Sequence, residues 1–223
     1  MPEVLVIVEG QTEEQFIKQL IAPALHSMQI FVKPQLLQTS PGFSGGAISF
    51  DRLKLHVRNA LRKPGSPIIS TFLDLYALDS SFPDFDLAQK KNTLEAKVRS
   101  LNEALHEAIV KLTSCRPERF VAHIQPHEFE GLLFSDVSAL TQVEPEWCRH
   151  KSTLTSIRAQ YQTPEHINDG YETAPSKRLG KLLRPEYRKT RHGPLAAKKI
   201  TLEVMERECP HFRSWMNRLR QLV

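Results

Sequence analysis

The sequence predicts an α/β fold in which a mostly parallel central sheet is flanked by helices. Apolar runs at 4–8, 68–73 and 120–125 alternate with helical patterns, as is typical of parallel sheets. The first run contains only Val, Leu and Ile, without polar alternation, which indicates a strand buried on both faces. The 223 residues are enough for one such domain or for one core with a small addition.

The other elements follow from apolar spacing and from helix-stop residues. Thr12 is a good N-cap for a helix that continues to about residue 28, and Pro23 should kink or divide this helix. Residues 30–37 predict a further strand, which Pro34 places at an edge or at a bulge. The remaining helices expected from apolar spacing cover residues 50–62, 87–112, 146–162, 195–208 and 211–222. We expect the longest of them to lie across one face of the sheet.

The last part of the chain is basic. Residues 174–223 contain 13 Lys or Arg and 4 Asp or Glu, whereas the other residues contain 17 and 21. We therefore divide the chain into an α/β core, 1–145, and a basic helical extension, 146–223, in which 187–194 is a basic loop. A cationic surface beside a carboxylate-rich one suits a polyanion such as DNA or RNA. The alternative is a solvated basic surface without a partner.

Composition argues against several protein classes. No apolar run approaches the roughly 20 residues that a membrane helix needs, and Met-Pro-Glu does not begin a signal peptide. Cys115, Cys148 and Cys209 are scattered and form no CxxC pair, which argues against a disulfide framework and against a zinc knuckle. We expect a cytoplasmic protein without a membrane segment.

Acidic side chains stand where three of the apolar runs end. They are Glu9, Asp74, and either Glu128 or Glu130. The carboxyl ends of parallel strands meet at one edge of a sheet, where open α/β folds bind ligands. Spacing leaves the third position open, because residues two apart on a helix do not share a face. Glu128 is nearer to the strand end than Glu130.

These carboxylates predict a divalent metal site. Clustered carboxylates repel one another unless a cation lies among them, and hard oxygen ligands favour Mg²⁺ or Mn²⁺ over zinc. Glu13, one helical turn beyond Glu9, can complete a second metal position. A metal beside a basic surface suggests phosphoryl transfer on nucleic acid, in which the metal orients a water and stabilises charge on the phosphate.

Four motifs in order resemble a known family. Residues 8–14 (VEGQTEE), followed by a strand that ends in Asp74, resemble the Toprim domain of topoisomerases, bacterial primases, ribonuclease M-type maturation enzymes and overcoming-lysogenization-defect (OLD) nucleases. The form of the first motif is most similar to the OLD-type branch. The later motifs resemble an uncharacterised Toprim-like family encoded beside ABC-type ATPases in bacterial defence loci. They are 125–130 (QPHEFE) with 132–136 (LLFSD), 172–178 (ETAPSKR) and 209–212 (CPHF).

The resemblance implies a Rossmann-like Toprim fold and a Mg²⁺-dependent nuclease of antiviral defence, acting with an ATPase partner. Glu9 matches the Toprim glutamate, Asp74 matches the first acid of the aspartate-x-aspartate motif, and Glu13 matches an extra acid of the OLD-type branch. Tyr76 stands where that motif has its second aspartate. A substitute ligand could come from Glu128, Glu130 or Asp79, between which the sequence does not choose.

Basic residues complete the hypothesis. The resemblance also implies a lysine near the scissile phosphate. Lys177 is the candidate because it follows a helix start, which we expect Thr173 to cap. The free N–H groups of a first helical turn favour an anion. The catalytic set is then Glu9, Asp74 and Lys177. The candidates for contact with the nucleic-acid backbone are Lys177, Arg178, Lys189 and Arg191.

Two other functions are weighed against a nuclease. One is a non-catalytic Toprim-like module that binds nucleic acid or the ATPase, its metal site having lost an acid at Tyr76. The other is an enzyme acting on small phosphates, which would leave the basic C-terminal part without a role and lacks a phosphate-loop motif. His127 is a candidate general base, although a histidine at such a junction is more often structural. Phe212 and Trp215 are interpreted as core.

Overall fold

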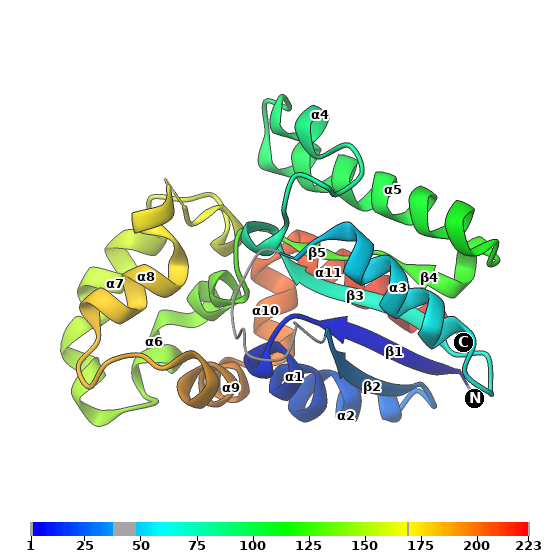
Figure 1. The fold of residues 1–223 in the computed structure, drawn as a ribbon. Coiled ribbons are helices and arrows are strands. Elements are labelled where there is room, and N and C mark those ends of the chain that lie inside the picture. Colours follow the sequence, from blue (N-terminus) through cyan, green and yellow to red (C-terminus); the bar gives the residue numbers. More distant parts are fainter. Residues whose placement is uncertain (1, 38–47, 169, 223) are drawn as a thin grey trace, which may run out of the picture.

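The computed structural model describes residues 2–37, 48–168 and 170–222, and its central sheet is flanked by helices (Figure 1). The strand order is β2-β1-β3-β4, with β5 also paired to β3, and every pairing between these strands is parallel. The strands are β1 (Glu3–Val8), β2 (Phe31–Leu36), β3 (Ile68–Asp74), β4 (Phe120–Val121) and β5 (Ile124–Gln125). The predicted α/β fold is thus confirmed, and β2 with Pro34 is an edge strand as expected.

Strand β1 lies in the interior of the sheet and is buried on both faces. Val4, Val6 and Val8 belong to one hydrophobic cluster, whereas Leu5 and Ile7 belong to another on the opposite face. Because successive side chains of a strand point to opposite faces, an uninterrupted apolar run is what such a strand needs.

One face is covered by α3 (Phe50–Leu61) and α5 (Leu94–Thr113), with the short α4 (Phe85–Gln89) beside α5. The prediction of a single helix over 87–112 is wrong in one respect, because two helices, α4 and α5, cover this range. Thr93 begins α5 as its N-cap, and its hydroxyl accepts a hydrogen bond from the Ala96 N–H at 3.2 Å. A capping threonine with its extended backbone outweighs the continuous helical spacing of the sequence.

The other face is covered by helices from both ends of the chain. From the N-terminal end come α1 (Gln11–Phe16), a π-helical turn (Ile17–Ile21) and α2 (Ala22–His26), which together form the helix that Pro23 was predicted to divide. From the C-terminal end come α9 (Lys189–Ile200), α10 (Leu202–Glu208) and α11 (Pro210–Arg220). Phe212 and Trp215 of α11 are fully buried, so their assignment to the core is confirmed.

The remaining segments connect these layers. They are α6 (Val137–Thr141), α7 (Lys151–Arg158), α8 (Pro175–Leu182) and 3₁₀ turns at Leu75–Ala77, Pro117–Arg119, Phe129–Asp136, Pro145–His150, Pro164–His166 and Tyr171–Thr173. One hydrophobic cluster contains residues from both sides of the predicted boundary at 145. The division of the chain into a core and an extension stays a prediction. Within the described ranges, no helix has the length and apolar character needed to cross a membrane.

Helix α9 corrects the prediction of a basic loop over 187–194. Pro194 lies inside this helix, preceded by Gly193. A Cβ atom on Gly193 would lie 2.9 Å from Thr12 Cγ2, 3.1 Å from the Tyr187 hydroxyl and 3.2 Å from Phe129 Cε1. The Gly-Pro pair therefore serves the close packing of α9 against α1, and tertiary packing overrides its usual preference for a turn.

The apolar run 120–125 forms two short strands, not one. Between them the Thr71 hydroxyl of β3 accepts from the His123 N–H at 2.8 Å and donates to the His123 carbonyl at 2.9 Å, and a long backbone hydrogen bond, from the Leu73 N–H to the His123 carbonyl at 3.4 Å, lies beside it. Both short strands still run parallel to β3, so the end of β5 remains at the same edge as Asp74.

Gly193→Ala should lower the free energy of unfolding by about 1–3 kcal/mol, because the added methyl group overpacks the contact between α1 and α9. Urea unfolding followed by circular dichroism measures the change. Gly180→Ala in α8 is the matched control, since its Cβ would lie 4.0 Å from the nearest atom, Glu186 Oε1. That variant should gain about 0.5–1 kcal/mol from helix propensity. Equal effects of the two substitutions would contradict the packing argument.

Candidate active site

The structure brings the predicted acidic residues together at the carboxyl edge of the sheet. Glu9 follows β1 and Asp74 ends β3, whereas Glu128 and Glu130 follow β5. The charges of Glu13, Glu128 and Glu130 all act on Glu9, and those of Glu13, Glu9 and Glu130 act on Asp74. The sequence left open whether Glu128 or Glu130 faces the site, and in the structure both belong to this carboxylate cluster. We use this name for Glu9, Glu13, Asp74, Glu128 and Glu130.

Burial makes the charges of the cluster costly. Desolvation, and after it the charge of Glu13, raises the pKa of Glu9 from 4.5 to about 7. Desolvation, followed by the charges of Glu13 and Glu9, raises the pKa of Asp74 well above its usual value. Burial likewise raises the pKa of Glu130, which is fully buried, to about 7. Such groups stay ionised only where a cation compensates them.

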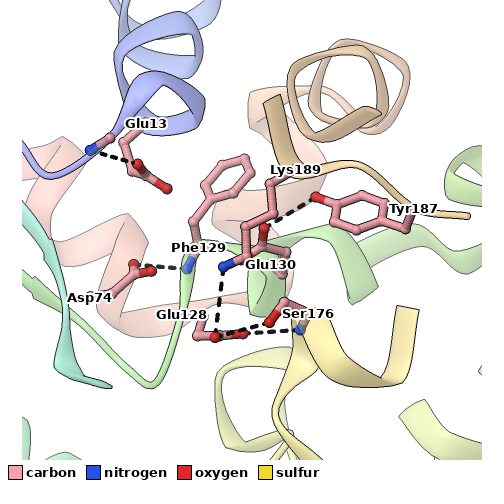
Figure 2. Close-up of polar contacts among 9 residues, drawn as sticks. Glu13, Asp74, Glu128, Phe129, Glu130, Ser176, Tyr187 and Lys189 are labelled. Carbon is pink, nitrogen blue, oxygen red and sulfur yellow. Dashed lines mark hydrogen bonds and ion pairs between the residues drawn. The ribbon is translucent and has the colours of Figure 1, made fainter. Parts of the chain in front are cut away.

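Lys189 provides part of this compensation. Its Nζ lies 3.2 Å from Glu130 Oε2 and 3.7 Å from Glu128 Oε1, and Figure 2 shows it pointing into the cluster. Partial burial acts to lower the pKa of Lys189, but the charges of Glu130, Glu128 and Asp74 outweigh it, so the pKa is raised. The sequence predicted Lys189 as a contact to the nucleic-acid backbone, whereas the structure places it among the acids, as the first residue of α9.

Glu128 contacts the start of α8, where the sequence predicted a bound phosphate. Its carboxylate accepts hydrogen bonds from the Ser176 N–H at 2.9 Å and from the Ser176 hydroxyl at 3.0 Å, in the first turn of α8. The N-cap of α8 is Ala174, and the hydroxyl of Thr173 instead donates to the Gly170 carbonyl at 3.1 Å. The prediction of Thr173 as N-cap is wrong because a distant carboxylate satisfies the first turn of the helix.

Lys177 lies next to Ser176 but is exposed to solvent. Its charge acts on Glu172, a fully exposed carboxylate that also pairs with Lys181 at 2.8 Å. Lys189 is the lysine whose charge acts on Glu9, Glu13 and Asp74. The catalytic role assigned to Lys177 stays a prediction. It was based on an anion at the start of α8, and the carboxylate of Glu128 already occupies that position.

Glu13 both caps a helix and faces the cluster. Its Oε2 accepts a hydrogen bond from the Gly10 N–H at 3.1 Å, so the N-cap of α1 is Gly10, not Thr12 as predicted. Thr12 is buried against Gly193 of α9. Burial nevertheless raises the pKa of Glu13, which shows that this hydrogen bond offsets only part of the desolvation cost.

Hydrogen bonds from outside the cluster fix two further acids. Asp74 Oδ1 accepts from the Phe129 N–H at 2.9 Å, and Glu130 Oε1 accepts from the Tyr187 hydroxyl at 3.3 Å (Figure 2). Sequence reasoning missed Tyr187 and Ser176, because no spacing rule links them to acids almost 50 or more residues away. The local sequence offers one indication of a role for Tyr187, its position directly before the basic segment 188–191.

The other predicted basic residues contact their own chain. Arg178 Nε donates to the Thr173 carbonyl at 2.6 Å, and its Nη2 donates to the Tyr161 hydroxyl at 2.8 Å. Arg191 forms a surface ion pair with Glu144 at 2.8 Å. These contacts leave their predicted role in nucleic-acid binding as a prediction.

The donor set fits Mg²⁺ or Mn²⁺ in its chemistry. All its members are carboxylates, which suit hard cations and do not suit a zinc site. Glu128 and Glu130 already form ion pairs with Lys189, so Glu9, Glu13 and Asp74 would be the principal ligands. In their arrangement, however, no three or more His, Cys, Asp or Glu side chains of the described residues are placed to hold a metal ion.

Comparison with family models gives one match, to the family described as "Domain of unknown function (DUF4276)", over residues 8–220. The chain belongs to the DUF4276 family. No curated protein and no solved structure matches it. The part that matches the DUF4276 model includes the whole carboxylate cluster, from Glu9 to Glu130, together with Lys189.

Glu9→Gln should stabilise the metal-free protein above pH 7 and leave its stability unchanged below about pH 4. Burial raises the pKa of the Glu9 carboxyl group from 4.5 to about 7 in the folded protein. The wild type therefore loses stability as the pH rises from 4.5 to 7, whereas an amide loses none. The difference should reach at most about 3 kcal/mol.

Denaturant unfolding in the presence of a chelator, repeated across this pH range, measures the difference. Added Mg²⁺ should stabilise the wild type more than the variant above pH 7, because the metal compensates the Glu9 charge. A difference between the two proteins that does not vary with pH would refute the electrostatic account of Glu9.

Proposed function

We propose that this protein is a Mg²⁺- or Mn²⁺-dependent nuclease that hydrolyses phosphodiester bonds of DNA or RNA. The observation that carries the proposal is the carboxylate cluster, where burial, and after it mutual repulsion, raises the pKa of acids from β1, β3 and the segment after β5. Such a group gains most from a divalent cation. A cation held by carboxylates at the edge of a sheet is suited to phosphoryl transfer.

The ligands and the lysine have separate roles in this proposal. Glu9, Glu13 and Asp74 would hold the metal, which when bound would supply an activated water and charge stabilisation on the phosphate. Lys189 binds a non-bridging phosphate oxygen. Its contact with Glu128 is the longer of its two ion pairs, at 3.7 Å, and is the one that a phosphate oxygen would replace.

Glu130 and Tyr187 position Lys189. Glu130 is fully buried and is fixed by the Tyr187 hydroxyl, so its carboxylate holds the ammonium group at 3.2 Å in a defined place. Gly193 allows Tyr187 and α1 to approach α9 closely, and this brings Lys189 to the acids on α1 and at the carboxyl edge of the sheet. A pre-organised cation of this kind costs little reorganisation when charge develops on the phosphate.

The resemblance of four sequence motifs to Toprim-like proteins supports the same reaction. It is also the basis for proposing an ABC-type ATPase partner and a role as the effector subunit in antiviral defence. Co-purification of the protein with the product of a neighbouring ATPase gene tests the partnership.

A non-catalytic binding module is the second candidate, and two observations favour it. Tyr76 replaces an acid of the Toprim pattern, and Lys189 already compensates Glu130. Mn²⁺ binding, measured by electron paramagnetic resonance, separates the two functions, since a module without a metal site leaves Mn²⁺ in solution.

Glu9→Ala and Glu13→Gln should each reduce the rate of Mg²⁺-dependent cleavage by on the order of 100-fold or more, because each removes a metal ligand. The assay uses purified protein with plasmid DNA, single-stranded DNA and RNA. Glu14→Gln is the matched control, since Glu14 lies on the same helix but lines an outer groove with Gln15 and Thr190. Absence of cleavage by the wild type in all three assays would refute the nuclease.

Lys189→Met should reduce the cleavage rate by on the order of 100-fold, and Lys177→Met should change it by less than about threefold. The physical reason is that Lys189 contacts Glu128 and Glu130, whereas Lys177 lies on the exposed surface of α8. Single-turnover kinetics at saturating Mg²⁺ provide the comparison. A larger loss for Lys177→Met would restore Lys177 as the catalytic lysine.

A further inference from the structure

An exposed aromatic pair stands at the rim of the carboxylate cluster. The Tyr76 side chain is 42% exposed, and its ring centroid lies 5.4 Å from that of His127, with the two planes inclined at 45°. Most large aromatic side chains of the described residues are buried, so an exposed ring beside the cluster is a notable surface feature.

The pair is attached directly to the acids. Tyr76 lies in the 3₁₀ turn that follows Asp74, and His127 directly precedes Glu128. The Tyr76 N–H donates to the His127 carbonyl at 3.2 Å, which ties the end of β3 to the segment after β5. The rings are therefore fixed in place relative to the carboxylates of Asp74 and Glu128.

The backbone and the ring of His127 are both constrained beside Tyr76. Its φ angle of 56° lies in the left-handed region, which is uncommon for residues other than glycine. Asn168 Nδ2 lies 3.4 Å from its Nδ1.

We propose that the Tyr76 ring, supported by His127, forms a stacking platform for an unpaired base of a nucleic-acid strand whose phosphate enters the carboxylate cluster. This inference rests on the proposed nuclease function and specifies its substrate as single-stranded nucleic acid or an unpaired segment. Both faces of a base inside a duplex are covered by its neighbours, whereas an unpaired base has a free face for an aromatic ring.

The electrostatics of the site give the platform a purpose. Without a metal, the ionised carboxylates of the cluster repel phosphate, and among the described residues Lys189 is the cation whose charge acts most strongly on Glu9 and Asp74. Stacking does not depend on charge, so it allows a strand to bind before, or without, the metal. Tyr76 is then a substrate-binding residue in the place where the Toprim pattern has an acid.

The test is binding of a fluorescein-labelled single-stranded oligonucleotide to metal-free protein in the presence of a chelator, followed by anisotropy. Tyr76→Ala should weaken binding about 5- to 150-fold, the range expected for one base stacked on one ring, and Tyr76→Phe should remain within about twofold. Tyr76→Trp should bind at least as tightly as the wild type, which a folding defect would not produce.

Phe31→Ala is the matched control. Phe31 is also an exposed ring, 37% exposed, and it also contacts a histidine, His26, at a centroid distance of 5.0 Å. It begins β2 and so lies at the opposite edge of the sheet from the cluster. This substitution should leave binding unchanged.

The outcomes separate this inference from the nuclease proposal. Tyr76-dependent binding without cleavage supports the platform and refutes the nuclease. Cleavage by a Tyr76→Ala variant that binds as tightly as the wild type overturns the platform and leaves the nuclease standing. The platform is also overturned if metal-free wild type does not bind the single strand, or if it binds a duplex of the same sequence as tightly.

Discussion

The mutual repulsion of buried carboxylates is the constraint around which this structure is organised. Three parallel strands deliver acids to one edge of the sheet, and burial raises the pKa of Glu9, Asp74 and Glu130. Parallel strands place their carboxyl ends together whether or not the side chains there repel one another. The fold therefore brings together charges that are stable only with a cation, and Lys189 is the cation that the chain itself supplies.

The position of Lys189 depends on packing far from its own sequence neighbours. Helix α9 lies against α1 because Gly193 leaves room for Thr12, Tyr187 and Phe129. The C-terminal helices thereby complete the layer begun by α1 and supply the cation to acids from the other end of the chain (Figure 1). This arrangement explains why basic and acidic residues are segregated along the sequence but meet in the structure.

The sequence was sufficient to predict the parts of the site that depend on local patterns. An apolar run that ends in an acid identified Glu9 and Asp74, because strand and edge follow from the same few residues. Ser176, Tyr187 and Lys189 could not be assigned in this way, since their roles depend on contacts across the fold. The predicted N-caps, Thr12 and Thr173, were wrong for the same reason. The start of α1 at Gly10 is capped by the carboxylate of Glu13, and the start of α8 after Ala174 is capped by the distant carboxylate of Glu128.

Tyr76 is better understood from its position than from the acid it replaces. It lies outside the cluster, with a side chain 42% exposed, whereas Glu130 is fully buried. A carboxylate at position 76 would stand in solvent at the rim, where repulsion from the other acids is screened and a metal ligand is weakly held. Glu13, on α1, and the residues after β5 supply further acids to the interior of the site. The loss of one acid at the rim therefore does not by itself remove the means of binding a metal, and it leaves a surface on which a base can stack.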